Sequence, residues 1–98
     1  MLIRIVRMTF REDSVQAFLN IFNNSRDKIR HFPGCRHLEL HRDANDPNTF
    51  CTYSHWESQD HLDRYRDSEL FGSVWPATKA LFAEKPFAFS NHIEQVVE

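Results

Sequence analysis

The strongest fold signal in the chain is residues 35–56, CRHLELHRDANDPNTFCTYSHW. Apolar and polar side chains alternate along residues 35–42 and again along 49–57, which is typical of half-buried β-strands. The residues between these runs, DANDPN, are nearly all turn formers. The pattern predicts a hairpin that turns about Asp46, so that residues whose numbers sum to about 92 lie opposite each other.

The alternation gives this hairpin two different faces. The face suited to burial under helices carries Leu38, Leu40, Phe50, Thr52, Ser54 and Trp56. The opposite, strongly polar face carries His37, Glu39, His41, Cys51, Tyr53 and His55. Imidazole and carboxylate are suitable metal ligands, but His37 and His41 lie about 13 Å apart on an extended strand, which leaves His37, Glu39 and His55 as the one chelating combination. We interpret this face as a hydrogen-bonded layer at a dimer interface or a solvated surface, with no metal.

The segment before the hairpin predicts a strand followed by a helix. Residues 1–10, MLIRIVRMTF, are rich in β-branched residues, and they place Ile3 and Ile5 on the face opposite Val6 and Met8. Asp13 is the expected N-cap of the helix, with Gln16 completing a capping box. One apolar helical face follows, formed by Val15, Phe18, Leu19, Phe22 and Ile29. Phe32-Pro33-Gly34 ends the helix.

The segment after the hairpin predicts a second helical region and a last strand. Ser58 is the expected cap of a helix that carries Leu62 and Tyr65, and Ser68 and Ser73 are expected to restart short helical turns. Pro76 is expected in the first turn after Ser73, and residues 87–97 form the strand. The order β-α-β-β-α-β predicts an α+β, ferredoxin-like domain over 1–98, with a four-stranded antiparallel sheet and both helices on one face. The other face is expected to bind a second copy.

Composition excludes several functional classes. The chain has 98 residues and a net charge of −2, so it lacks the broad positive field that nucleic acid or an anionic membrane surface attracts. It contains no apolar run of membrane-spanning length and no signal pattern at its start. Its two cysteines, Cys35 and Cys51, lack CxxC spacing. We therefore expect a cytoplasmic protein with reduced thiols.

Polar and aromatic side chains gather where the second hairpin strand meets the next helix. Trp56 ends the strand, while His61 and Tyr65 are four residues apart and so share one face of the helix. These residues place an indole, an imidazole and a phenol near one mouth between sheet and helices. Core packing of the two aromatic rings, or a surface position for the histidine, is the alternative interpretation.

Several motifs, in order and spacing, resemble the antibiotic biosynthesis monooxygenase domain family. They are Phe32-Pro33-Gly34-Cys35, Arg42-Asp43, Asp46-Pro47-Asn48-Thr49-Phe50, Trp56-Glu57-Ser58 and Tyr65-Arg66-x-Ser68-x-x-Phe71. The resemblance covers nearly the whole chain and implies a dimeric α/β barrel, in which two ferredoxin-like sheets pack face to face. Each protomer is then expected to keep a pocket between sheet and helices.

The family's chemistry is mixed, and departures from its patterns narrow the choice. Haem-degrading members carry an Asn on the first strand, where this chain has Val6, and a haem-ligating His at the position of Trp75. Phenol-oxidising members carry an Asn four residues before the strand-end Trp, where this chain has Thr52 and keeps Trp56. The resemblance therefore disfavours haem and leaves a monooxygenase open.

We hypothesise a cofactor-independent monooxygenase that acts on a small planar aromatic of the phenol or quinol type. Trp56 is expected to orient the substrate, Tyr65 to donate a hydrogen bond and His61 to act as the base. The expected substrate-binding residues are Thr52, Phe18, Phe22, Phe71 and Phe82. The alternatives are a homodimeric ligand-binding or structural module without turnover, and a small isomerase or lyase that acts on a carbonyl compound.

Overall fold

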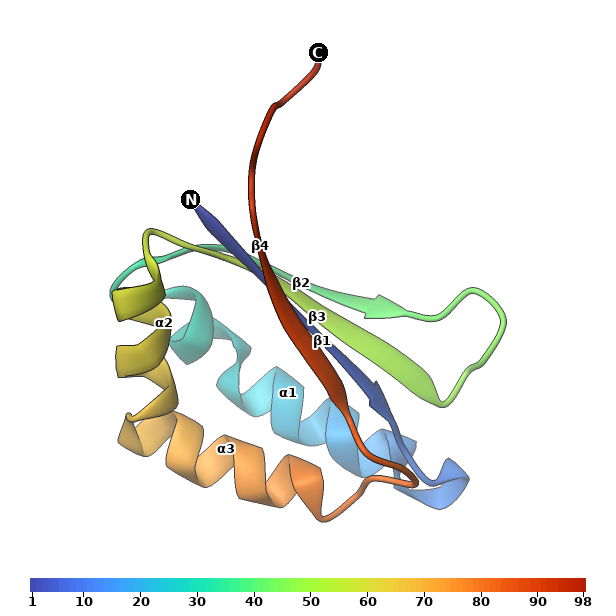
Figure 1. Cartoon of the computed structure of the whole chain (residues 1–98). Coiled ribbons are helices and arrows are strands. Elements are labelled where there is room, and N and C mark those ends of the chain that lie inside the picture. Colours follow the sequence, from blue (N-terminus) through green and yellow to red (C-terminus); the bar gives the residue numbers. More distant parts are fainter.

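The computed structural model describes residues 1–98, and it contains one sheet whose helices all lie against the same face (Figure 1). The elements are β1 (Leu2–Thr9), the 3-10 turn η1 (Glu12–Ser14), α1 (Val15–Arg30), β2 (Cys35–Arg42), β3 (Thr49–Trp56), α2 (Gln59–Arg66), α3 (Glu69–Lys79) and β4 (Phe87–His92). The four strands are antiparallel in the order β2-β3-β1-β4, and the sheet is open. The ferredoxin-like α+β prediction is confirmed.

The predicted register of the hairpin is also confirmed. Pairing runs from His37 opposite His55 to Arg42 opposite Phe50, and each pair of numbers sums to 92. The turn is fixed by two carboxylates: Asp43 accepts the backbone N–H of Asn45 and of Asp46, and Asp46 accepts that of Asn48. The register shifts between Cys35 and His37, so Cys35 lies opposite Trp56.

The core consists of two separate clusters under the sheet. One cluster joins Leu2, Cys35, Trp56 and Leu62 at the end of the sheet near α2. The other joins Met8, Phe10, Phe18 and Phe50, and in it the rings of Phe10 and Phe18 stack with centroids 4.2 Å apart. Because the two clusters are separate, unfilled space remains between them under the sheet.

The helix starts predicted at Ser58 and Ser68 are correct. Ser58 Oγ accepts the backbone N–H of His61, and Ser68 Oγ accepts that of Phe71. The predicted capping box at Asp13 is wrong: η1 runs directly into α1, so Asp13 lies inside the turn and its carboxylate accepts a hydrogen bond from the Ser14 hydroxyl. None of the helices is both long and apolar enough to cross a membrane.

The predicted restart at Ser73 is wrong, because α3 is continuous from Glu69 to Lys79 and Pro76 lies in its second half. Pro76 cannot donate to the carbonyl of Gly72, four residues earlier, but Gly72 is exposed and water can replace that bond. The last strand is shorter than predicted. His92 already pairs with Leu2, the first residue of β1, so residues 93–97 have no strand to pair with and extend away from the sheet (Figure 1).

The uncovered face of the sheet has an apolar half and a polar half. Ile3 and Ile5 lie on it as predicted; in the β1–β4 pairing Phe89 lies opposite Ile5, and Phe87 lies opposite Arg7 on the same face. The side chains of Phe87 and Phe89 contact each other and are 64% and 36% exposed. Large apolar side chains are therefore left facing solvent in the single chain.

Candidate active site

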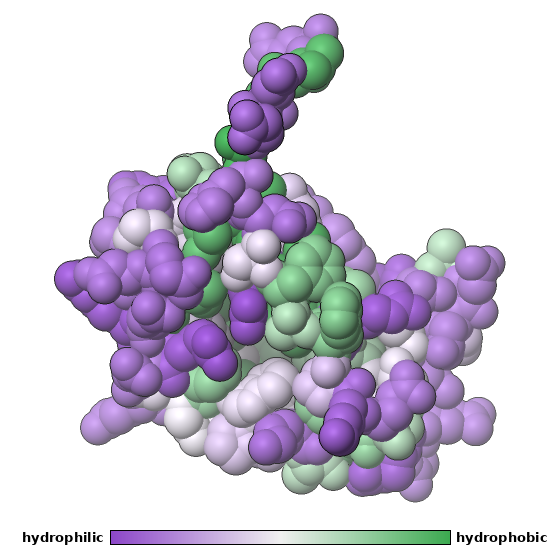
Figure 2. All heavy atoms as spheres, in the orientation of Figure 1, coloured by the Kyte–Doolittle hydropathy of each residue, from purple (hydrophilic) through white to green (hydrophobic).

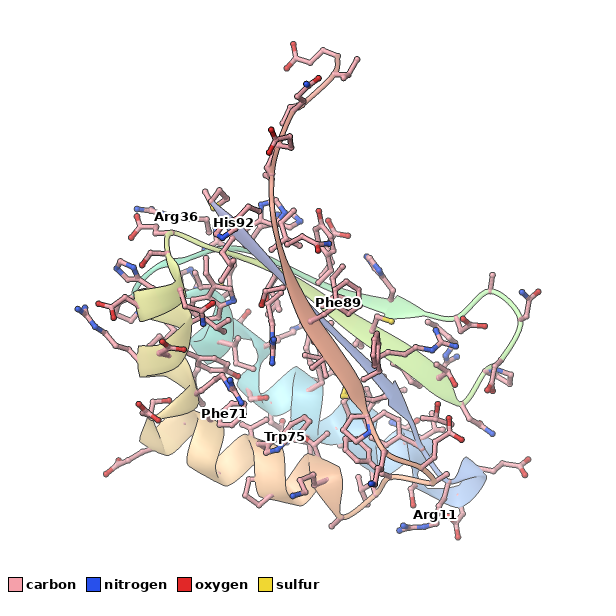
Figure 3. The ribbon with its side chains drawn as sticks, viewed as in Figure 1. Arg11, Arg36, Phe71, Trp75, Phe89 and His92 are labelled. Carbon is pink, nitrogen blue, oxygen red and sulfur yellow. The ribbon has the colours of Figure 1, made fainter.

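A cavity of about 230 Å³ lies between the sheet and the helices, in the space between the two core clusters. Twenty residues line it, fourteen of them hydrophobic. Phe71 and Trp75 extend from α3 into the space below the sheet (Figure 3). Figure 2 shows apolar residues gathered in the middle of the same view, with hydrophilic residues around them. An apolar cavity of this size suits a small ligand with a planar ring.

A stacked aromatic pair forms one end of the cavity. The rings of Trp56 and Tyr65 lie nearly parallel, with centroids 5.0 Å apart. Trp56 is 1% exposed, and its Nε1–H donates to Ser54 Oγ at 3.0 Å. Phe71 packs edge-on against Tyr65. The indole N–H is thus already bound within the sheet, and Trp56 contributes a fixed aromatic surface.

The Tyr65 hydroxyl is the one phenol at the cavity. Burial, and secondarily the Cys35 thiol, raises the pKa of Tyr65 to about 12, and no hydrogen bond within the chain contributes to that shift. The group is therefore fully protonated at neutral pH, and its O–H donates to no acceptor within the chain. Tyr65 can act as a hydrogen-bond donor and cannot act as a base.

The structure brings most of the predicted site residues together, but it leaves two outside the cavity. Thr52, Phe18, Phe22 and Phe71 line it with Trp56 and Tyr65. Those that do not line it are His61 and Phe82.

His61 and Phe82 make other contacts. The His61 ring is bound between Ser58 Oγ, 2.7 Å from Nδ1, and the Glu57 carboxylate, 3.3 Å from Nε2, and it packs on the backbone of Gly34. Phe82 packs against Phe10 in the core. A base role for His61 remains a prediction, which requires the ring to leave these partners.

The cavity is also lined by two arginines that were not predicted as site residues. Arg4 lies on β1 opposite Ser54, on the covered face, and Arg66 is the last residue of α2. The signal for Arg4 was present, since the alternation that turns Val6 and Met8 inward also turns Arg4 inward. Trp75 is a further lining residue, and its place depends on the continuity of α3.

The polar stripe on the uncovered face is a hydrogen-bonded layer. The Glu39 carboxylate binds the imidazole of His37 with one oxygen and that of His41 with the other, the latter at 2.6 Å. These two bonds, His41 first, hold the pKa of Glu39 below its usual value. Glu39 thus provides a hydrogen-bond partner for both imidazoles from the middle of the strand. This agrees with the hydrogen-bonded layer that the sequence predicts for this face.

The family model described as antibiotic biosynthesis monooxygenase matches residues 1–74. The chain belongs to the antibiotic biosynthesis monooxygenase family. No curated protein sequence matches it significantly.

Solved structures extend the likeness to nearly the full length. An antibiotic biosynthesis monooxygenase is 21% identical with a TM-score of 0.91, covering 97% of this chain and 100% of its own. A proposed antibiotic biosynthesis monooxygenase from Nitrosomonas europaea is 16% identical with a TM-score of 0.89, at 97% and 100% coverage. Rv0793 from Mycobacterium tuberculosis is 18% identical with a TM-score of 0.89, at 99% and 98% coverage. At these identities the likeness shows a shared fold.

The residues that line the cavity indicate whether it fits a haem, as in the haem-degrading members of the family. Val6 and Trp75 both line the cavity, so the two positions that the resemblance associates with haem degradation do face the site. Neither supplies a nitrogen that can ligate iron, and no histidine is among the lining residues. The side chains present do not fit a haem held by an axial histidine.

Proposed function

We propose that the chain is a cofactor-independent monooxygenase that oxidises a small planar phenol or quinol to a quinone. One observation carries the proposal: an apolar cavity, in a member of this family, ends in the Trp56–Tyr65 stack with an unbound phenolic O–H. The ring stacks on aromatic walls, and the donor stabilises charge that develops on oxygen. Membership supports the reaction class, and the cavity supports the substrate's shape.

The chemistry balances with dioxygen as the oxidant. The ionised phenol transfers one electron to O₂, and the resulting radical and superoxide combine to form a carbon–oxygen bond. Protonation gives a hydroperoxide. Cleavage of its O–O bond then leaves a carbonyl on the ring, and the other oxygen departs as water with the phenolic proton and the ring hydrogen. The substrate supplies every electron. In this scheme Tyr65 donates a hydrogen bond to the reduced oxygen, and Thr52, Phe18, Phe22 and Phe71 hold the ring.

The isomerase or lyase alternative has less support. Proton abstraction next to a carbonyl needs a base within hydrogen-bond reach of the substrate. The lining residues include no histidine, lysine, aspartate or glutamate, and the pKa of Tyr65 is too high for a base at neutral pH. A ligand-binding module without turnover stays as the outcome to be distinguished by experiment.

We also propose that the protein acts as a homodimer through the uncovered sheet face. Ile3 and Ile5 with the exposed Phe87 and Phe89 form an apolar surface that no helix of the same chain covers. Light scattering should give about twice the 11.7 kDa chain mass, and Phe89→Glu should shift the mass toward one chain. A monodisperse monomer of the parent chain at micromolar concentration would refute this arrangement.

Oxygen uptake against a panel of quinols, anthrols and flavonoids tests the activity, with the quinone product identified. Tyr65→Phe should lower the rate on the order of 10²-fold, because it removes only the donor. Tyr53→Phe is the matched control, since Tyr53 is the other tyrosine of the chain and lies on the uncovered face. His61→Gln tests the base role separately. Equal rates in the two Tyr→Phe variants would refute the role of Tyr65. Ligand binding without oxygen uptake for any compound would favour the binding module.

A further inference from the structure

The wall of the cavity carries positive charge and no negative charge. Arg4 and Arg66 are its only ionisable side chains other than Tyr65, and no aspartate or glutamate lines it. Arg4 comes from the central strand β1 and is half-buried, whereas Arg66 comes from the end of α2 and is exposed. Two guanidinium groups from different elements therefore border one apolar cavity.

Neither guanidinium forms an ion pair within the chain. The ion pairs of the structure involve other residues, and the one hydrogen bond of the Arg4 side chain goes to Ser90 Oγ at 3.2 Å. Asp63 and Asp67 border a shallow depression beside Arg66 on the outside of α2, but they form no ion pair with it. For the half-buried Arg4, an unpaired charge in an apolar wall is costly, and an anion placed beside it lowers that cost.

The two arginines also act on each other. Burial first, and then the positive charge of Arg66, lower the pKa of Arg4. The two guanidinium groups are thus close enough to repel each other, and a negatively charged group placed near both is attracted by both. A planar guanidinium binds the two oxygens of a carboxylate, or a single phenolate oxygen, with strong hydrogen bonds.

We propose that the cavity binds planar aromatic compounds through an anionic oxygen group, phenolate or carboxylate, that lies against Arg4 and Arg66 while the ring lies among Phe22, Phe71 and Trp75. This assignment deepens the proposed function and rests on it for the fate of the ligand, whereas binding is independent of turnover. It also gives the reaction its ionised substrate without a base in the wall: the arginines favour the phenolate over the phenol.

Binding of 2-naphthoate and of its neutral isostere 2-naphthamide to the full chain tests the proposal. Calorimetry measures both affinities. Fluorescence reports the site, because the only two tryptophans, Trp56 and Trp75, both line the cavity. The carboxylate should bind about ten-fold or more tightly than the amide. Equal affinities would overturn the proposal.

Charge-removing variants locate the anion site. Arg4→Met and Arg66→Met should each weaken 2-naphthoate by about ten-fold and leave 2-naphthamide unchanged. Arg64→Met is the matched control: Arg64 is also on α2, carries the same charge, and pairs with Asp60 away from the cavity. If Arg4→Met fails to fold in a melting experiment, Arg66→Met alone decides. A loss in Arg64→Met equal to that in Arg66→Met would overturn the proposal, because it would report only the overall charge.

Two further readouts separate the sources of the anion and the two proposals. Bound 4-nitrophenol should show the absorbance of its phenolate at a pH where the free compound is still protonated. A shift identifies a phenolate site; no shift, with arginine-dependent 2-naphthoate binding, identifies a carboxylate site. Arginine-dependent binding without oxygen uptake refutes the monooxygenase and keeps the anion site. Oxygen uptake unaffected by either arginine variant refutes the anion site and keeps the monooxygenase.

Discussion

Gly34 and Gly72 allow a matched test of the contact that holds His61. Gly34 precedes β2 with a φ of +90°, and a Cβ built there would overlap Cβ, Cγ and Cδ2 of His61. Gly72 lies on the exposed side of α3, and a Cβ built there meets nothing within 4 Å. The same chemical change, Gly→Ala, therefore meets opposite environments.

The magnitudes follow from these two environments. At Gly34 the positive φ costs an alanine about 1–2 kcal/mol, and forcing a methyl group into packed atoms costs about 1–3 kcal/mol. The sum is about 2–5 kcal/mol, and at about 4–8 °C per kcal/mol for a chain of this size the melting temperature should fall by at least about 8 °C. Gly72→Ala should instead raise the free energy of unfolding by about 0.5–1 kcal/mol, because alanine lowers the conformational entropy of the unfolded chain at a position that is helical when folded.

Thermal and urea denaturation of the two variants give the comparison. Gly34→Ala combined with His61→Ala separates the two costs at Gly34. Loss of the imidazole removes the overlap with Cγ and Cδ2 but leaves His61 Cβ and the positive φ, so stability should recover only in part. A Gly34→Ala variant that melts within about 2 °C of the parent would refute the reasoning. It would show that α2 is free to move away from Gly34, and the base role of His61 would then gain support.

Three further predictions concern titration and ligands. Spectrophotometric titration should show one of the two tyrosines ionising at a pKa of about 12, and the Tyr65→Phe variant should lack that step. Because the pKa of Tyr65 is raised in the folded chain, its contribution to stability is complete below about pH 10 and is lost as the pH rises through about 12. Haem titration should give no saturable one-to-one Soret shift of a histidine-ligated species, and tight stoichiometric binding that His61→Ala abolishes would contradict this. Burial, and then the charge of His37, lower the pKa of His55, so the contribution of His55 to stability is complete above about pH 6.5 and is lost on acidification. The urea concentration at the unfolding midpoint should therefore decrease when the pH is lowered from about 7.5 to about 5.5, and it should decrease less in His55→Gln.

Local chemistry made the hairpin predictable. The turn residues between positions 42 and 49 supply carboxylates that accept backbone N–H groups of the loop itself, so the register is set within a few residues of Asp46. Ser58 and Ser68 were predictable as helix caps for the same reason, because each hydroxyl bonds a backbone N–H three residues away. Signals of this kind need no knowledge of distant parts of the chain.

Features that depend on distant parts were missed. The end of β4 is set by where β1 begins, which residues 87–97 do not reveal by themselves. His61 and Tyr65 are four residues apart on one helix, yet the His61 ring packs against Gly34, from the loop before β2, and does not line the cavity. Arg4 was not predicted as a site residue, although the alternation along the first strand places it on the covered face with Val6 and Met8.

The pKa shifts of Arg4 and Tyr65 have one leading cause, and together they indicate what kind of ligand the cavity favours. Burial raises the pKa of the phenol and lowers that of the guanidinium, because an apolar surrounding penalises either charge alone. Arg4 is already partly desolvated in the folded chain, so an incoming anion loses its own water but removes less water from Arg4 than it would from a fully exposed guanidinium. An aromatic ring attached to that anion compensates its desolvation by burying apolar surface against Phe71 and Trp75. A neutral ring leaves Arg4 unpaired, and a small inorganic anion buries no apolar surface. An aromatic ring and an anionic group in one molecule interact favourably with both the apolar and the charged parts of the wall.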